Sequence, residues 1–213
     1  MRFILKLSYA CAKKLAIVLN ENHNKRAIYY YGFYMVFSTL LEGIILISVS
    51  LLLGILVPTI LITCVFGFLR MFAGGFHFDT LGRCLFISMG LFIVFALISQ
   101  YTYKYWNITS VAIFLFMVFA FSLVSAIKYA PKDTPTKPIT DPVEIAKFKR
   151  LSIVYLGIWL IVCSILTVLA QYMYAIAMGF GVLLEIFSIT PIGHLFFNKI
   201  KGGLNNKSKL RLS

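Results

Sequence analysis

Residues 70–84 hold the side chains of this chain that could carry out covalent chemistry. They include one histidine, His77, and one cysteine, Cys84, seven residues apart in a chain that is 61% hydrophobic. Ionisable groups among apolar segments are costly and indicate function by default. A histidine and a cysteine close together, away from any cluster of metal ligands, are typical of a thiol nucleophile with its general base. The pattern predicts thiol-based catalysis that uses neither a metal nor a cofactor.

Helix geometry requires a break between these two groups. On one continuous helix they would lie about 10 Å apart along the axis, whereas proton transfer needs about 3 Å or one bridging water. Two consecutive glycines, Gly74 and Gly75, permit such a break and a turn. If the next helix begins near Asp79, Cys84 lies in its second turn, within reach of a returning His77.

Three effects are expected to favour the thiolate of Cys84. They are the base His77, the positive end of the following helix, and the guanidinium group of Arg70 or Arg83. The helix-end effect weakens after the first turn, so we expect the histidine and the arginines to dominate. Backbone N–H groups near the glycine pair or Arg83 are candidates for an oxyanion hole.

The same residue types also have purely structural explanations. A glycine pair in a membrane helix is more often a packing contact. A lone cysteine is more often a small buried hydrophobe, which we expect for Cys64 and Cys163. The joint occurrence of arginine, histidine, aspartate and cysteine at one boundary of an apolar segment favours function.

Composition predicts a multi-pass membrane protein. Of the 213 residues only 13% are charged, against about 25% in a soluble domain. The net charge of +13 does not indicate nucleic-acid binding, because the basic residues lie in the gaps between apolar segments. The four cysteines show no paired spacing, so the sequence predicts neither a disulfide framework nor a zinc site.

The apolar segments predict a single all-α membrane domain, with about six transmembrane helices over residues 28–190. Residues 2–20 precede this bundle as an amphipathic helix, which we expect to lie on an anionic leaflet. The second segment, residues 58–72, has about 15 residues, which is short for a crossing of ~30 Å, so it is tilted or re-entrant. A polar loop is expected over residues 128–150, and a basic tail without regular structure over residues 199–213.

The distribution of basic residues predicts the orientation. If the N-terminus is cytoplasmic and each segment crosses once, only Lys104 of the 20 lysines and arginines lies outside. This asymmetry predicts six crossings with both termini in the cytoplasm. It also places His77 and Cys84 at the cytoplasmic face.

At these residues the chain resembles the accessory gene regulator B (AgrB) family, membrane peptidases of Gram-positive quorum-sensing systems. The resemblance covers nearly the whole chain, including its length and number of segments. The features that carry it are Arg70, the Ala73-Gly74-Gly75-Phe76-His77 run, Cys84 at the family's His-to-Cys spacing, the proline- and lysine-bearing segment 129–139 and, more weakly, Tyr31-Gly32 with Glu42.

The resemblance implies a cysteine endopeptidase of the bacterial cell membrane that processes an AgrD-type pro-peptide in quorum sensing and virulence regulation. The family's cysteine, here Cys84, would attack a backbone carbonyl and hold the peptide as a thioester. The family's histidine, here His77, would act as general base and then as acid to the leaving amine. An internal Cys or Ser of the peptide would then displace the enzyme, giving a cyclic thiolactone or lactone. A homodimer is a further family-level expectation, for which no residue pattern argues.

The acidic residues have two interpretations each. Glu42 and Glu185, the only acids well inside crossings, either orient His77 or contact the peptide, or else make buried polar contacts to another helix. Asp79 suits the third member of a catalytic triad and equally a helix cap. Glu42, Asp79 and the absence of any third catalytic residue therefore all stay open.

The basic residues are similarly ambiguous. Arg70 and Arg83 either bind the acidic part of the pro-peptide or mark the membrane boundary. Lys132 and Lys137 either dock the substrate or belong to a solvated loop. The other two histidines of the chain, His23 and His194, are expected to be inert.

Two other classes of protein compete with a peptidase. In a small transporter or exporter, the glycine break and the buried acids would form a substrate path. Internal inverted repeats would favour this class, and the sequence shows none. In a membrane scaffold without chemistry, Cys84 would tolerate replacement by alanine.

Overall fold

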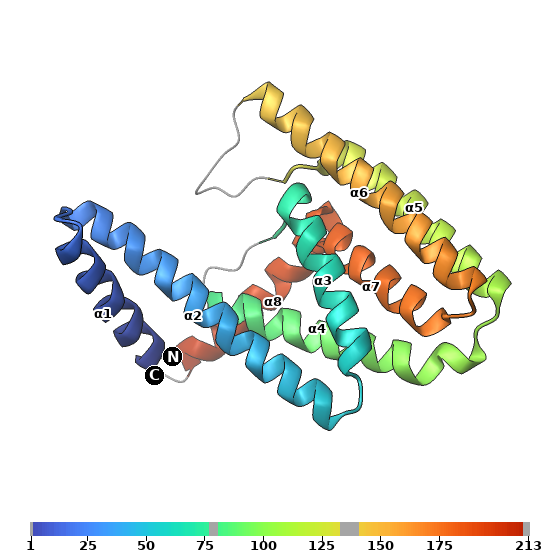
Figure 1. The fold of residues 1–213 in the computed structure, drawn as a ribbon, viewed down its shortest axis with the longest axis horizontal. Helices are drawn as coiled ribbons and strands as arrows, with labels where there is room; N and C mark the ends of the chain where they lie inside the picture. Colours follow the sequence, from blue (N-terminus) through green and yellow to red (C-terminus); the bar gives the residue numbers. More distant parts are fainter. Residues whose placement is uncertain (1, 77–80, 133–140, 211–213) are drawn as a thin grey trace. The chain divides into compact units, whose positions relative to one another are not determined.

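The computed structural model describes residues 2–76, 81–132 and 141–210, with the backbone alone at residue 2 and at residues 81–85 and 203–210. Over these ranges the chain folds into eight α-helices and one short 3₁₀ turn, η1 (Tyr103–Tyr105), and contains no strand (Figure 1). The helices are α1 Arg2–Val18, α2 His23–Leu52, α3 Leu56–Ala73, α4 Leu81–Thr102, α5 Ile108–Tyr129, α6 Pro142–Val168, α7 Tyr172–Ile189 and α8 Pro191–Leu210.

Six segments of the described chain have the length and apolar composition of membrane spans, which confirms the predicted all-α polytopic fold. They are α2, α3, Phe86–Tyr105, α5, α6 and α7. The second of them, α3, has 18 residues, or about 27 Å, close to the ~30 Å of a hydrocarbon core. It is longer than expected because Pro58 lies in its first turn, where the backbone N–H has no helical partner to lose.

By its internal contacts the chain divides into two compact units. The first consists of Met1–Gly54 and Asp79–Gly90, and the second of Ile55–Phe78 and Leu91–Ser213. The first unit therefore holds α1, α2 and the start of α4. The second holds α3, the rest of α4, and α5 to α8.

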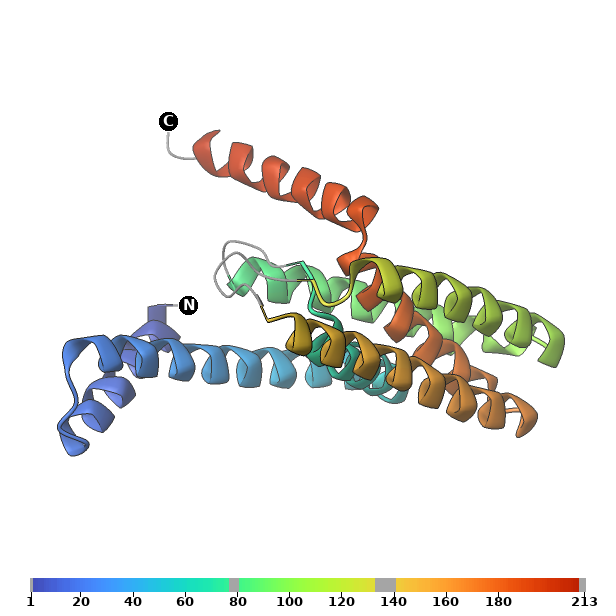
Figure 2. The same ribbon diagram turned by 90° about the horizontal axis from the view of Figure 1, so that it is seen from above.

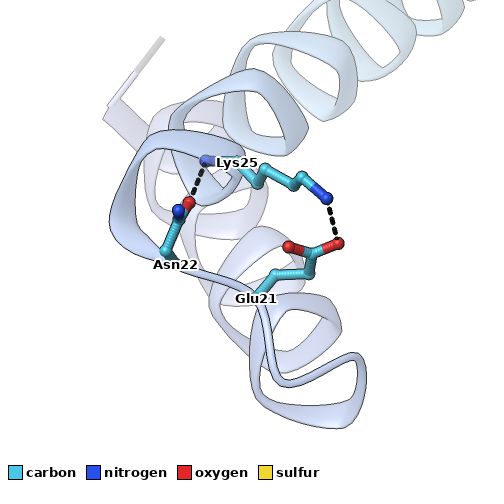
Figure 3. A network of polar contacts seen from close by, with 3 residues as sticks. All are labelled: Glu21, Asn22 and Lys25. Atoms are coloured by element: carbon cyan, nitrogen blue, oxygen red, sulfur yellow. Dashed lines mark hydrogen bonds and ion pairs between the residues drawn. The ribbon is translucent and has the colours of Figure 1, made fainter.

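In the first unit, α1 packs against α2, and a short polar turn connects the two helices. The predicted helix over residues 2–20 is present as α1, and the chain leaves it through Asn20, whose φ is +49°. The side-chain oxygen of Asn22 then caps α2 by accepting a hydrogen bond from the backbone N–H of Lys25, at 3.2 Å (Figure 3). The Lys25 ammonium also pairs with Glu21 at 2.5 Å. Polar residues thus end one helix and begin the next.

In the second unit, α7 is the central helix. It contacts α3, α5 and α6, and 61% of its span is buried, against 33% or less for each of the other five spans. Gly181 lets α3 approach closely, because a Cβ at this position would lie 2.9 Å from the carbonyl oxygen of Ile62. The helices α5 and α6 run side by side along this core in both views (Figure 2).

Two aromatic side chains in this unit donate to backbone carbonyls of neighbouring helices. The Tyr155 hydroxyl donates to the carbonyl of Val65 at 3.1 Å, and the Trp159 indole N–H donates to that of Met178 at 3.2 Å. Because an unpaired polar group in an apolar interior is costly, these bonds favour one arrangement of α3, α6 and α7.

Two segments expected to be irregular are helical instead. Residues 142–150, placed by the sequence analysis in a polar loop, form the start of α6. Asp141 caps this helix by accepting from the N–H of Val143 at 2.9 Å, and Pro142 occupies its first position. Most of the basic tail continues α8, which extends to Leu210.

The start of α8 has the same two helix-start signals as α6, a proline in the first position and a side chain that caps the first turn. Pro191 is its first residue, and the Thr190 hydroxyl accepts from the N–H of Gly193 at 3.1 Å. The expectation of an irregular tail was wrong over residues 199–210 because charge alone does not prevent a well-started helix from continuing.

Candidate active site

The helix break predicted at the glycine pair is confirmed. Helix α3 ends at Ala73, and the next described helix, α4, begins at Leu81. Gly74 has φ +78° and Gly75 has φ +146°, values that L-residues with a side chain rarely adopt. The backbone therefore leaves the helix where glycine makes this possible.

The segment of residues 74–76, here called the connecting segment, is held first by the chain that follows α5. The backbone N–H of Lys132 donates to the carbonyl of Ala73 at 2.8 Å, and Gly74 and Lys132 form an isolated parallel bridge. A Cβ on Gly74 would overlap the carbonyl group of Lys132. Two motifs distant in sequence thus lie side by side, and glycine is required for their approach.

An ion pair between α3 and α7 holds the far end of the connecting segment. Arg70, in the last turn of α3, places Nη1 3.3 Å from Oε2 of Glu185 on α7. Its other terminal nitrogen, Nη2, donates to the carbonyl oxygen of Phe76 at 2.8 Å. The Glu185 side chain is fully buried and that of Arg70 is 22% exposed. The guanidinium group therefore joins a buried carboxylate to the residue directly before His77.

Gly75 packs directly against this ion pair. A Cβ at Gly75 would lie 2.9 Å from Nη1 of Arg70, 3.1 Å from Oε1 of Glu185 and 2.7 Å from the hydroxyl oxygen of Ser188. These distances are shorter than ordinary contacts between carbon and polar atoms, so a side chain at this position would have to displace the polar groups around it. The ion pair therefore fills the space that a side chain at residue 75 would need.

The ring of Phe76 is held by α8. Its centroid lies 5.1 Å from that of His194 in an edge-on arrangement and 5.3 Å from that of Phe197 in a stacked one. Aromatic pairs at these distances each contribute about 0.5–1.5 kcal/mol beyond their buried area. The connecting segment is therefore fixed by α3, α7, α8 and the chain after α5.

His194 gives this packing a dependence on pH. Its Nε2 atom is buried, and burial, with a smaller contribution from the charge of Lys132, lowers the pKa of His194 below its ordinary value. In the unfolded chain the imidazole takes up a proton near pH 6.5. The unfolded state therefore binds more protons below this pH, so stability is retained above about pH 6.5 and decreases as the pH falls below it.

We expect His194→Asn to reduce the loss of melting temperature between pH 7.5 and pH 5.5, measured on detergent-solubilised protein. The control is His23→Asn, at an exposed position in the other unit, which should show the same loss as the unmodified protein. An equal loss in all three proteins would contradict the assignment to His194.

The residues singled out from the sequence lie in different parts of the chain. His77, Asp79 and Lys137 are outside the described residues, so the approach of His77 to Cys84 stays a prediction. Arg83 and Cys84 lie at the start of the described part of α4, where the backbone alone is described.

The remaining sequence-predicted residues are all described. Glu42 is half-buried in α2, and the side chain of Lys132 is exposed. Within the described chain no three residues among His, Cys, Asp and Glu are grouped as metal ligands would be.

Sequence reasoning missed three contributions to this site. His194 was expected to be inert, yet its ring contacts Phe76. Nothing in the sequence around Ser188 indicated that it would lie beside the ion pair. Lys132 was considered for its charge, whereas its backbone makes the contact with Ala73. The one available signal was the Thr190-Pro191 helix start, which directs the aromatic residues of α8 back towards α7.

Comparison with known proteins agrees with the architecture. The sequence model of accessory gene regulator B matches residues 8–189. AgrB-like protein 2 of Clostridium perfringens strain 13 is 26% identical over 212 residues, covering 95% of this chain and 98% of that protein. An AgrB-like protein of Listeria innocua is 25% identical over 162 residues, covering 76% of this chain and 75% of that protein.

No solved structure matches the chain significantly. The family match extends from α1 to the end of α7 and therefore contains the connecting segment, its ion pair and both His77 and Cys84. This multi-pass membrane protein belongs to the accessory gene regulator B family.

Proposed function

We propose that this protein is a cysteine endopeptidase that cleaves the C-terminal part of an AgrD-type pro-peptide. Membership of the family supports the processing of such a peptide in general terms. The observation that carries the specific proposal is the end of α3 at Ala73, followed by Gly74 and Gly75 with positive φ, so that no continuous helix runs from α3 through the glycine pair before His77 and Cys84. A break of this kind lets a histidine approach a cysteine seven residues later, which one helix would prevent.

The proposed reaction proceeds through a thioester. His77 takes the proton of the Cys84 thiol, and the thiolate attacks the carbonyl carbon of the scissile peptide bond. The protonated His77 then gives this proton to the leaving amine, and the peptide stays bound to sulfur as an acyl group. An internal Cys or Ser of the peptide attacks the thioester, loses its proton to His77 and releases the Cys84 thiol. The product is a cyclic thiolactone or lactone.

The position of Cys84 bears on one part of this scheme. The first described residue of α4 is Leu81, three residues before Cys84. The positive end of a helix acts within its first turn and lowers the pKa of a cysteine there. We therefore propose that the start of α4 supports the thiolate beside His77 and the arginines.

The described contacts narrow the assignments of the charged residues. Arg70 and Glu185 bind each other and the connecting segment, so we do not assign either to the pro-peptide. We propose the exposed Lys132, with Arg83 and Lys137, as contacts for the acidic part of the substrate. We also propose that both termini and this site face the cytoplasm of a bacterial cell, with α1 on the anionic leaflet.

Co-expression with an AgrD-type pro-peptide tests the proposal. Cys84→Ala and His77→Ala are each expected to abolish cleavage. The unmodified protein should carry a hydroxylamine-sensitive peptide adduct on Cys84, visible by mass spectrometry. Cys64→Ala and His23→Ala serve as matched controls and should cleave normally.

Cleavage that persists in Cys84→Ala would overturn the nucleophile assignment. Repeating the assay in detergent, where no transport across a membrane takes place, separates a peptidase from the transporter considered above. A detergent-solubilised protein that cleaves the peptide supports the peptidase. Loss of all cleavage on solubilisation of a folded protein would favour the transporter.

A further inference from the structure

We infer that the ion pair of Arg70 and Glu185 is a positioning device that fixes the peptide unit carrying His77. The inference rests on the proposed function, in which His77 is the general base. It assigns to both residues a role that acts through His77 rather than on the substrate. Arg70 and Glu185 are therefore positioning residues.

The hydrogen bond to Phe76 is the first step of the argument. Nη2 of Arg70 lies 2.8 Å from the carbonyl oxygen of Phe76. This carbonyl belongs to the planar peptide unit that joins Phe76 to His77. A donor on its oxygen therefore restrains the plane from which the backbone of residue 77 continues. The ring of Phe76 is held separately by α8, so the unit is fixed from two sides.

The geometry of the guanidinium group explains why a carboxylate is needed behind it. An arginine side chain has several rotatable bonds and by itself directs its donors in many ways. Glu185 lies on the buried face of α7 with no exposed surface and holds Nη1 at 3.3 Å. Because the guanidinium fork is planar and rigid, fixing Nη1 also sets the direction of Nη2. The buried carboxylate thus orients the donor that contacts Phe76.

The alternative is that the pair only holds α3 against α7. Apolar residues already make this contact, among them Leu69 and Ala73 on α3 and Val182 and Ile186 on α7, all buried in one core cluster. Apolar side chains of similar volume commonly stabilise such an interface as well as a buried ion pair or better. The contact with Phe76 is what the ion pair adds.

The test uses the reaction of Cys84 with iodoacetamide, which needs no substrate. The full-length protein carries Cys11→Ser, Cys64→Ala and Cys163→Ala, so that Cys84 is its only thiol. The rate of alkylation between pH 5 and pH 9 reports the formation of the thiolate, and His77→Ala gives the profile without the base. A shift of the parent profile on His77→Ala confirms that His77 acts on this thiol.

Glu185→Gln and Arg70→Lys are the test variants. Glutamine keeps the shape of Glu185 without its charge, and lysine keeps the charge of Arg70 without the fork. We expect both to shift the alkylation profile from that of the parent towards that of His77→Ala. We also expect kcat for pro-peptide cleavage to fall by roughly 10- to 100-fold, with KM changed by less than about twofold. If one variant fails to fold, the other supplies the same readout.

The matched control is Glu21→Gln, which removes another ion-paired carboxylate in the α1–α2 turn and should leave both readouts unchanged. Profiles of Glu185→Gln and Arg70→Lys that coincide with the parent would overturn the inference, even if the melting temperature fell, because the pair would then be structural only. If His77→Ala itself leaves the profile unchanged, the proposed function fails first and the inference falls with it.

Discussion

Replacing Gly75 by alanine is expected to abolish processing of the pro-peptide and to reduce the free energy of unfolding by about 2–5 kcal/mol. Two physical causes act at this position. Gly75 has φ +146°, where a residue with a Cβ is strained. The added methyl group would also lie within 3.1 Å of three polar atoms that surround it.

Relief of this overlap would disturb the proposed catalytic base. Glu185 is fully buried on α7 and cannot withdraw without losing its pairing with Arg70. A shift of either the Arg70 side chain or the connecting segment would separate the Phe76 carbonyl from Nη2 of Arg70. A displacement of about 1 Å at a catalytic group can cost roughly 100-fold in rate. We therefore expect activity to be lost even in the fraction of Gly75→Ala that folds.

The measurement compares Gly75→Ala with Gly157→Ala. Gly157 lies within α6, and a Cβ there would meet no atom within 4 Å. Alanine at this position should stabilise the helix slightly, by up to about 1 kcal/mol, and leave cleavage unchanged. Equal melting temperatures and equal cleavage in the two variants would show that the space around Gly75 is not restricted.

The helical architecture could be predicted from the sequence because its signals are local. Apolar runs of membrane-spanning length and the glycine pair can each be read from one continuous stretch of sequence. Both predictions, of the spans and of the helix break, are confirmed. Boundaries were less accurate where a polar sequence also carried helix-start signals. Asp141-Pro142 and Thr190-Pro191 begin helices that extend through residues 142–150 and 199–210, which charge alone suggested were irregular.

The contacts of the candidate site could not be predicted in the same way. Arg70 and Glu185 are 115 residues apart, and their pairing depends on which face of α7 packs against α3. The sequence therefore left Arg70 open between substrate contact and boundary marker. The backbone contact of Lys132 with Ala73 has no signature in side-chain types at all. Both contacts arise from the packing of α7 and from the chain after α5.

Arg70→Met is expected to destabilise the protein by about 3–5 kcal/mol, because it leaves the fully buried carboxylate of Glu185 without its cation. The double variant Arg70→Met/Glu185→Leu should recover most of this loss. Removing both charges also removes the desolvation penalty, and apolar side chains of similar volume commonly match or exceed a buried ion pair in stability. The two variants should therefore differ by several degrees in melting temperature.

Recovery of stability should not restore cleavage. In the double variant the interface between α3 and α7 is apolar and packed, yet no guanidinium group donates to the carbonyl of Phe76. Stability and activity are thus expected to separate, which thermal melting and pro-peptide cleavage on the same purified samples would measure. A stable double variant that cleaves at the unmodified rate would mean that the packing of Phe76 against His194 and Phe197 positions His77 without the ion pair. If it is as unstable as Arg70→Met, the loss comes from the arginine's packing and not from an unpaired buried charge.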